Sequence, residues 1–92
     1  MAYRILEPLF PLGRTVATPA AIALGIDLAS YLRRHHCGVW GDLDECDKQA
    51  NDEALTNADR ILSCYRVPGG HRIYIITEAD RSSTCILLPE EY

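Results

Sequence analysis

The chain has 92 residues, which is enough for one domain. A chain of this size buries about 60–65% of the surface that it exposes when unfolded, so it can form one modest core. Apolar residues make up 48% and charged residues 24%, which are ordinary values for a globular protein, and the net charge is −4. Coating of nucleic acid needs a strongly positive surface, so this charge argues against direct nucleic-acid binding.

Cysteine usage and hydropathy indicate a cytoplasmic protein that does not contact a membrane. The start, MAYRILEPLFPLGR, has an acid and two prolines where a secretory signal needs an apolar core. The longest apolar run, residues 16–29, is interrupted by polar residues, so it predicts no membrane span. No two cysteines form a CxxC pair, and we expect reduced thiols because a protein without a secretory signal stays in the reducing cytosol. The four are Cys37, Cys46, Cys64 and Cys85.

A short strand is predicted at 13–17, and a helix over 19–36 follows it. Thr18 is a typical N-cap, because its hydroxyl can accept from a free backbone N–H, and Pro19 suits the first helical position. Gly38 suits the left-handed residue that ends a helix. The last turn carries positive charge that meets the negative helix end, from Arg33, Arg34, His35 and His36.

A second helix is predicted at 43–56. Asp42 followed by Glu45 predicts a capping box, with Asp in place of the usual Ser or Thr. A narrow apolar stripe is expected to face the core, at Leu43, Cys46, Ala50 and Ala54. Trp40 precedes this helix. Buried, it would cap the core where the chain reverses, whereas exposed it would anchor a partner.

After residue 58 the apolar spacing changes to the period of two that is typical of strands. The three predicted strands are RILSCYRV (60–67), HRIYIITE (71–78) and STCILLP (83–89). Short turns at 68–70 and 79–83 join them into an antiparallel meander. The order β-α-α-β-β-β predicts one α+β domain over residues 1–92, with an antiparallel three- to four-stranded sheet and two helices on one face.

The acidic stretch VWGDLDECDKQANDEAL admits several interpretations. A calcium loop would use Asp42, Asp44 and Glu53, but its sixth position needs glycine and holds Asp47, and its fifth holds Cys46. A catalytic carboxylate pair needs a pocket that separates two pKa values, which an exposed helix does not provide. A solvated helix face and an acidic docking face for a basic partner therefore remain. The candidate partner-binding residues are Trp40, Asp42, Asp44, Glu45, Asp47, Asp52 and Glu53.

Metal and thiol chemistry receive little support, and we expect no cofactor. A zinc site would draw on His35, His36, Cys37 and Cys46, but these lack the short paired spacings of structural zinc. The histidines fit better as charge at the helix C-terminus, and the two strand cysteines as small core residues. The turn in TEADRSS (77–83) is explained by local hydrogen bonds, with an Arg–carboxylate cluster or a binding tip as alternatives.

Three segments resemble a family of short uncharacterised proteins of bacterial plasmids and integrative mobile elements. They are PLGRTVATPAA, WGDLDECDKQANDEAL and YIITEADRSSTCILLPEEY, in that order, and together they span about residues 9 to 92. The resemblance brings no catalytic residues. It implies an accessory gene of a mobile element, and small acidic proteins in that setting are often inhibitors of host defence, such as anti-CRISPR proteins.

The first functional expectation is therefore a non-enzymatic protein whose acidic helix face occupies a basic, nucleic-acid-binding surface of a partner, such as a nucleoprotein defence complex. The second is a regulatory or structural homodimer, formed through a sheet edge or the C-terminal strand CILLP. The third is a small thiol- or metal-dependent enzyme.

Overall fold

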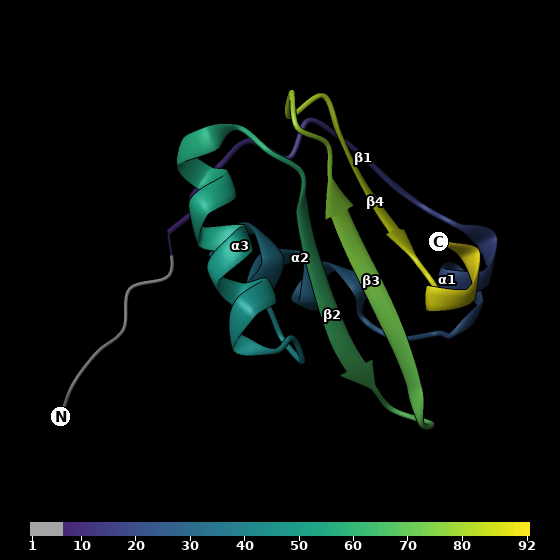
Figure 1. The fold of residues 1–92 in the computed structure, drawn as a ribbon. Helices are drawn as coiled ribbons and strands as arrows, with labels where there is room; N and C mark the ends of the chain where they lie inside the picture. Colours follow the sequence, from purple (N-terminus) through teal and green to yellow (C-terminus); the bar gives the residue numbers. More distant parts are fainter. Residues whose placement is uncertain (1–6) are drawn as a thin grey trace, which may run out of the picture.

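Four strands form one sheet in the computed structural model, which describes residues 7–92, and the helices lie behind and beside it (Figure 1). In chain order the elements are β1 (Arg14–Ala17), α1 (Pro19–Ala23), α2 (Leu28–His36), α3 (Glu45–Asn57), β2 (Ile61–Val67), β3 (His71–Thr77), β4 (Ser83–Leu87) and a final 3-10 turn η1 (Pro89–Glu91). The α+β class and the four strands are confirmed.

The sheet has the order β1-β4-β3-β2 and is mixed. β2, β3 and β4 form the predicted antiparallel meander, but β1 pairs with β4 in parallel. The prediction of a purely antiparallel sheet is therefore wrong for β1. The helical segment after β1 carries the chain behind the sheet and returns it to the same end, so β2 starts in the same direction as β1.

The predicted single helix over 19–36 is divided into α1 and α2. Its start is as predicted: Thr18 Oγ1 accepts from the Ala21 N–H at 3.2 Å, and Pro19 occupies the first helical position. The break falls at Gly25, which has a left-handed φ of 68°. Asp27 then caps α2 by accepting from the Ser30 N–H at 3.3 Å. Because the sheet is twisted, two short helices can stay in contact with its surface, whereas one straight helix would diverge from it.

The main core lies between the sheet and the helices α1 and α2. Every second residue of β2, β3 and β4 points inward, as the pleat requires. This inner face meets apolar side chains of both helices, among them Leu24, Tyr31 and Leu32. The buried apolar residues of this cluster are Ala21, Tyr65, Val67, Ile73, Ile75 and Ile86.

A second apolar cluster lies beneath α3, where Phe10 and Trp40 pack beside Ala54 and Ile61. The rings of Phe10 and Trp40 stack with centroids 6.2 Å apart. Trp40 is only 4% exposed, so the prediction that it caps the core is confirmed and the exposed-anchor alternative is wrong. A tryptophan in this position buries its large ring in the gap between α3 and the sheet.

The helix α3 differs from its prediction in its cap and in its buried face. Asp44, not Asp42, is the N-cap, and its Oδ1 accepts from the Asp47 N–H at 2.8 Å. The expected stripe is also wrong, because Cys46 and Ala50 are exposed. Asn51 and Ala54 are the buried residues of α3. The helix packs beside the edge strand β2, so the face toward the sheet includes a polar residue that bonds the strand backbone.

Candidate functional site

Residues of the acidic stretch form hydrogen bonds with the backbone groups on the open edge of β2. In this strand the N–H and C=O groups of Leu62, Cys64 and Arg66 point away from β3, and an unpaired edge of this kind invites association with other strands. The Asn51 side chain pairs with Leu62 on both sides, accepting from its N–H at 3.1 Å and donating to its C=O at 2.7 Å.

The loop before α3 covers the rest of this edge. The Cys64 N–H donates to the Trp40 C=O at 3.2 Å, and the Asp42 N–H donates to the Cys64 C=O at 2.6 Å. The Asp42 carboxylate then accepts from the Arg66 N–H at 3.2 Å and lies 3.7 Å from the Arg66 Nε. Gly41 sits between them with a φ of 81°, where any side chain would collide with the Cys64 carbonyl. The stretch therefore closes the β2 edge.

Of the seven predicted partner-binding residues, four are thereby used inside the fold. Trp40 is buried, and its Nε1 donates to the Asp52 carboxylate at 3.0 Å. Asp42 holds Arg66, and Asp44 caps α3. Glu45, Asp47 and Glu53 are exposed carboxylates, and Glu45 is 94% exposed at its side chain.

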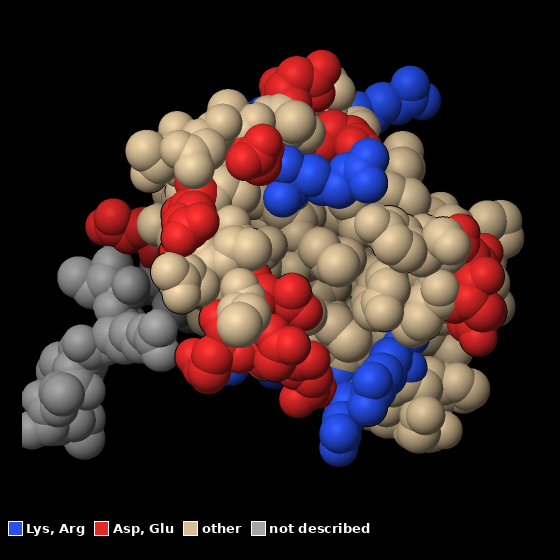
Figure 2. Space-filling model, viewed as in Figure 1, with Lys and Arg blue, Asp and Glu red and all other residues tan. Residues whose placement is uncertain are grey.

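The net charge of the protein is concentrated on α3. With its N-cap Asp44, the helix carries five acids and one base, Lys48, whose ammonium lies 3.8 Å from Glu45. The remaining residues hold eight acids and eight bases. The net charge of −4 therefore belongs to this one helix, and Figure 2 shows carboxylates gathered on that side of the molecule.

A buried chain of hydrogen bonds connects α2 to four other segments: β2, β3, β4 and the chain before β1. His35 Nδ1 lies 2.6 Å from Ser63 Oγ, and its Nε2 lies 2.9 Å from Thr77 Oγ1. Thr77 Oγ1 lies 2.7 Å from Thr84 Oγ1, which donates to the Leu12 C=O at 2.7 Å. The direction follows from the last bond: Thr77 must donate to Thr84, so His35 Nε2–H donates to Thr77 and Nδ1 accepts from Ser63.

This network corrects the expectation that His35 contributes charge at the end of α2. The side chain is 0% exposed, and burial lowers the pKa of the imidazole to about 3, with the charge of His36 acting in the same direction. The ring is therefore neutral at physiological pH. A serine that donates to histidine resembles a nucleophile–base pair, but Ser63 is fully buried and no substrate reaches it.

The thiols and the surface hollows offer no assembled reactive centre in the part of the chain that is described. Burial raises the pKa of the Cys64 and Cys85 thiols, which disfavours the nucleophilic thiolate. Within residues 7–92, no three His, Cys, Asp or Glu side chains converge as metal ligands. A surface hollow between the α1–α2 connection and the turn at 68–70 is lined by Asp27 and Tyr31, with no cysteine or histidine in its lining.

The turn at 78–82 is held by local bonds, as predicted. The Asp80 carboxylate accepts from the Ser82 N–H at 2.9 Å. Arg81 has a left-handed φ of 61° and points its guanidinium at the end of α3, donating to the C=O groups of Ala54 at 2.9 Å and Asp59 at 2.6 Å. This arginine binds backbone carbonyls at the end of α3 and just after it, not the neighbouring carboxylates, so the alternative of an Arg–carboxylate cluster is wrong.

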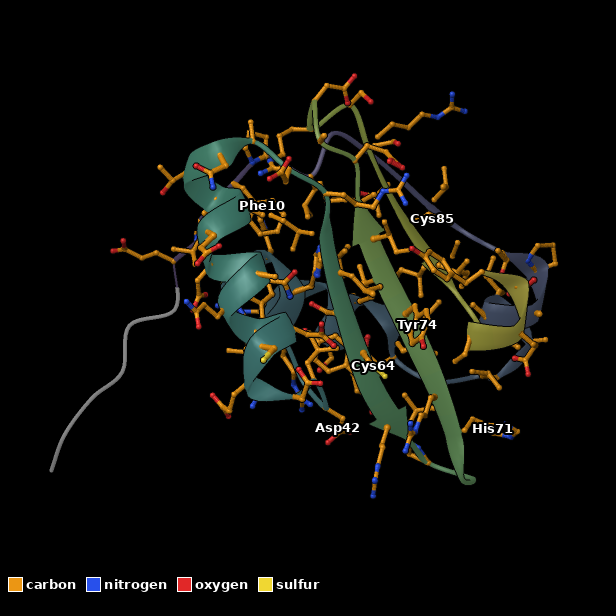
Figure 3. All side chains as sticks on the ribbon, in the orientation of Figure 1. Phe10, Asp42, Cys64, His71, Tyr74 and Cys85 are labelled. Carbon is orange, nitrogen blue, oxygen red and sulfur yellow. The ribbon has the colours of Figure 1, made fainter. Side chains whose placement is uncertain are left out.

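The outer face of the sheet carries a surface that the sequence did not reveal. None of the helices α1, α2 and α3 covers this face in Figure 1, and Figure 3 shows Cys64, Tyr74 and Cys85 on three adjacent strands. The C-terminal Tyr92 ring packs edge-on against Tyr74, with ring centroids 5.7 Å apart, so the chain end covers part of the face beside β4. The strand register places apolar side chains directly opposite one another in two rows. The first row is Leu62, Ile76, Cys85 and Val16, and the second is Cys64, Tyr74 and Leu87.

Cys64, Ile76 and Leu87 are buried, but Val16 is 41% exposed, and Leu62, Tyr74 and Cys85 are half-buried. The missed signal was in the strands themselves. RILSCYRV and HRIYIITE have apolar residues at successive positions, which is typical of strands that are covered on both faces.

No family model matches the chain, and no curated protein or solved structure matches it either. The candidate surfaces therefore stand on geometry alone. Over residues 7–92, no helix has the length and apolar character needed to cross a membrane.

Proposed function

We propose that the protein is a non-enzymatic binding protein, and that the exposed side of α3 docks onto a basic surface of a partner protein. The observation that carries this proposal is the concentration of the whole net charge on one helix. Carboxylates spread over the surface would serve solubility equally well, whereas a single acidic helix produces a directed negative potential.

The acids that remain free define the docking residues more narrowly than the sequence did. Among residues 7–92, the one ion pair of Glu45, Asp47 and Glu53 is the 3.8 Å contact of Glu45 with Lys48, and Glu53 also accepts from the Gln49 side chain at 3.1 Å. The helical rise places Glu45 and Glu53 about 12 Å apart along one helix. Glu45 and Glu53 lie about 80° apart around the helix axis, whereas Asp47 lies nearly opposite Glu45. The pair Glu45 and Glu53 suits a groove of Arg and Lys side chains that otherwise holds a phosphate backbone.

The resemblance to proteins of mobile elements gives this docking a biological setting. We propose an accessory, anti-CRISPR-like role, in which the acidic helix competes with nucleic acid for a groove of a host defence complex. This finer proposal is supported by the resemblance and by the charge of α3. The identity of the captured partner tests it.

The test compares two variants with the same change in charge. Glu45→Lys with Glu53→Lys changes the docking helix, and Glu7→Lys with Asp59→Lys changes two other exposed acids. Each tagged protein is used to capture partners from a bacterial lysate, and the captured protein is then purified and titrated at 50 and 300 mM salt.

We expect the first variant to lose the partner and the second to retain it. We also expect binding of the unaltered protein to weaken at the higher salt concentration, because surface charge contacts are screened. If the α3 variant binds the partner as tightly as the control variant does, the proposal is refuted.

A further inference from the structure

The outer sheet face combines an apolar centre with opposite charges at its two corners. At the end of the sheet that holds the turn at 68–70, Arg66 and Arg72 stand directly opposite each other on β2 and β3. The other corner of the same end holds η1, with the exposed acids Glu90 and Glu91. Figure 2 shows this face as an uncharged surface with separate basic and acidic groups at its margin.

The two arginines are an unfavourable pair within one chain. Like charges directly opposite each other across two strands repel. The Asp42 carboxylate lies 3.7 Å from the Arg66 Nε, but no carboxylate in residues 7–92 lies within ion-pair distance of Arg72. A sheet corner of this kind gains stability when external carboxylates approach it.

The acidic corner at η1 holds a carboxylate without a cationic partner among the described residues. Glu91 is used inside the chain, where its carboxylate accepts from the Thr18 hydroxyl at 2.7 Å and from the Leu88 N–H at 2.9 Å. Glu90 is exposed and makes no ion pair with another described residue. Among residues 7–92, one face therefore presents an unpaired cation at Arg72 on β3 and an unpaired carboxylate at Glu90 after β4.

We propose that this outer face binds a second copy of the chain, sheet against sheet. A twofold axis that lies in the interface and runs along the strands superposes the β2 side of one sheet on the β1 side of the other, at the same end. It places Arg66 and Arg72 of each copy against Glu90 of its partner. The two apolar rows then meet in the middle, about 10 Å from backbone to backbone, as in a sheet sandwich.

A second copy fits better than an unrelated partner because both halves of the complementary pattern occur on this one face. At the opposite end of the face Arg60 is already paired with Glu78 at 3.3 Å, while Arg14 of β1 adds a positive charge that the twofold axis places near this ion pair of the partner. A four-stranded face of about 15 by 20 Å is small among specific interfaces, so we expect a weak dimer that forms over roughly 10–500 µM.

The test is a charge exchange read by sedimentation equilibrium over that concentration range. Arg72→Glu alone places a carboxylate against Glu90 of the partner, and Glu90→Arg alone places a guanidinium against Arg72, so we expect each to weaken the dimer by about tenfold or more. The double variant restores opposite charges at this pair, and because Arg66 is already bonded to Asp42, we expect it to dimerise like the unaltered protein. Arg33→Glu, on the exposed side of α2, is the matched control and should leave the dimer unchanged.

A monomer at every concentration overturns the proposal. A dimer that ignores the single reversals, or one that the double variant does not restore, overturns it equally, because it uses another surface or another orientation. Unchanged circular dichroism of each variant separates dissociation from unfolding. The docking role of α3 is tested with other residues, so either proposal can fail while the other stands.

Thiol alkylation provides a second readout within the unaltered protein. Cys85 lies in the proposed interface, and Cys46 is exposed on α3. Dilution below the dissociation range should raise the alkylation rate of Cys85 several-fold relative to that of Cys46, as measured by peptide mass mapping. A constant ratio from 500 to 5 µM would contradict the interface.

Discussion

Acidification should destabilise this protein through His35, and the structure gives the size of the effect. The folded state holds the pKa of this imidazole at about 3, whereas the unfolded chain has the ordinary value of 6.5. Between these values the unfolded state binds one more proton than the folded state, so stability falls as the pH is lowered through 6.5. Each pH unit is worth about 1.4 kcal/mol, which gives a loss of about 2 kcal/mol at pH 5.

The assay is urea unfolding at several pH values from 7.5 to 5, followed by the fluorescence of Trp40, which is buried and is the single tryptophan of the chain. A loss of 2 kcal/mol corresponds to a fall of roughly 8–16 °C in Tm for a domain of this size. Asp80, whose carboxyl pKa is lowered by its hydrogen bonds to Ser82, titrates below this pH range.

The matched control is His35→Gln, which cannot take up the proton. The other two histidines are present in both proteins, so their contributions cancel in the comparison. We expect the variant to be less stable at pH 7.5 but to lose about 2 kcal/mol less than the unaltered protein on going to pH 5. Equal pH slopes for the two proteins, or an NMR titration of the His35 ring between pH 5 and 7, would refute the reasoning.

Three further predictions concern stability in urea. Thr77→Val leaves His35 Nε2–H without its acceptor and should cost about 1–3 kcal/mol, so an unchanged midpoint would rule out the assigned bond direction. Asn51→Ala exposes the β2 edge and should cost a similar amount and increase aggregation on light scattering, unlike the exposed Gln49→Ala. Gly41→Ala should prevent stable folding, whereas Gly70→Ala, with equal backbone conformation and open space, should give only about 1 kcal/mol of strain; comparable circular dichroism melts would contradict this.

The contacts of the acidic stretch at the β2 edge show why it was hard to interpret from the sequence. A carboxylate looks the same in the sequence whether it caps a helix, holds a strand edge or faces a partner. Asp42 bonds Arg66 of β2, 24 residues away, and Asp52 bonds Trp40 in the preceding loop, whereas Asp44 caps the first turn of α3. Only Glu45, Asp47 and Glu53 remain exposed carboxylates that are available to a partner, as was expected of the whole stretch.

His35 illustrates the same limit for a buried group. Its position in a run of basic residues at the end of α2 predicts a solvated charge. Its burial depends on Ser63, Thr77 and Thr84, which come from three different strands and have no mark in the sequence that distinguishes them from ordinary strand residues. Correct helix assignment did not help, because the helix face toward the sheet was set by the packing of α2 across β2 and β3.

The sequence by itself determined what depends on neighbours within a few residues: the start at Thr18, the extent of α3, and the strands of the meander with their turns. Local backbone preferences and apolar spacing suffice for these features. Tertiary structure alone decided the parallel pairing of β1, the break at Gly25, the sealing of the β2 edge and the uncovered outer face. Each of these depends on which distant segments lie side by side, and a pattern read along one chain does not contain that information.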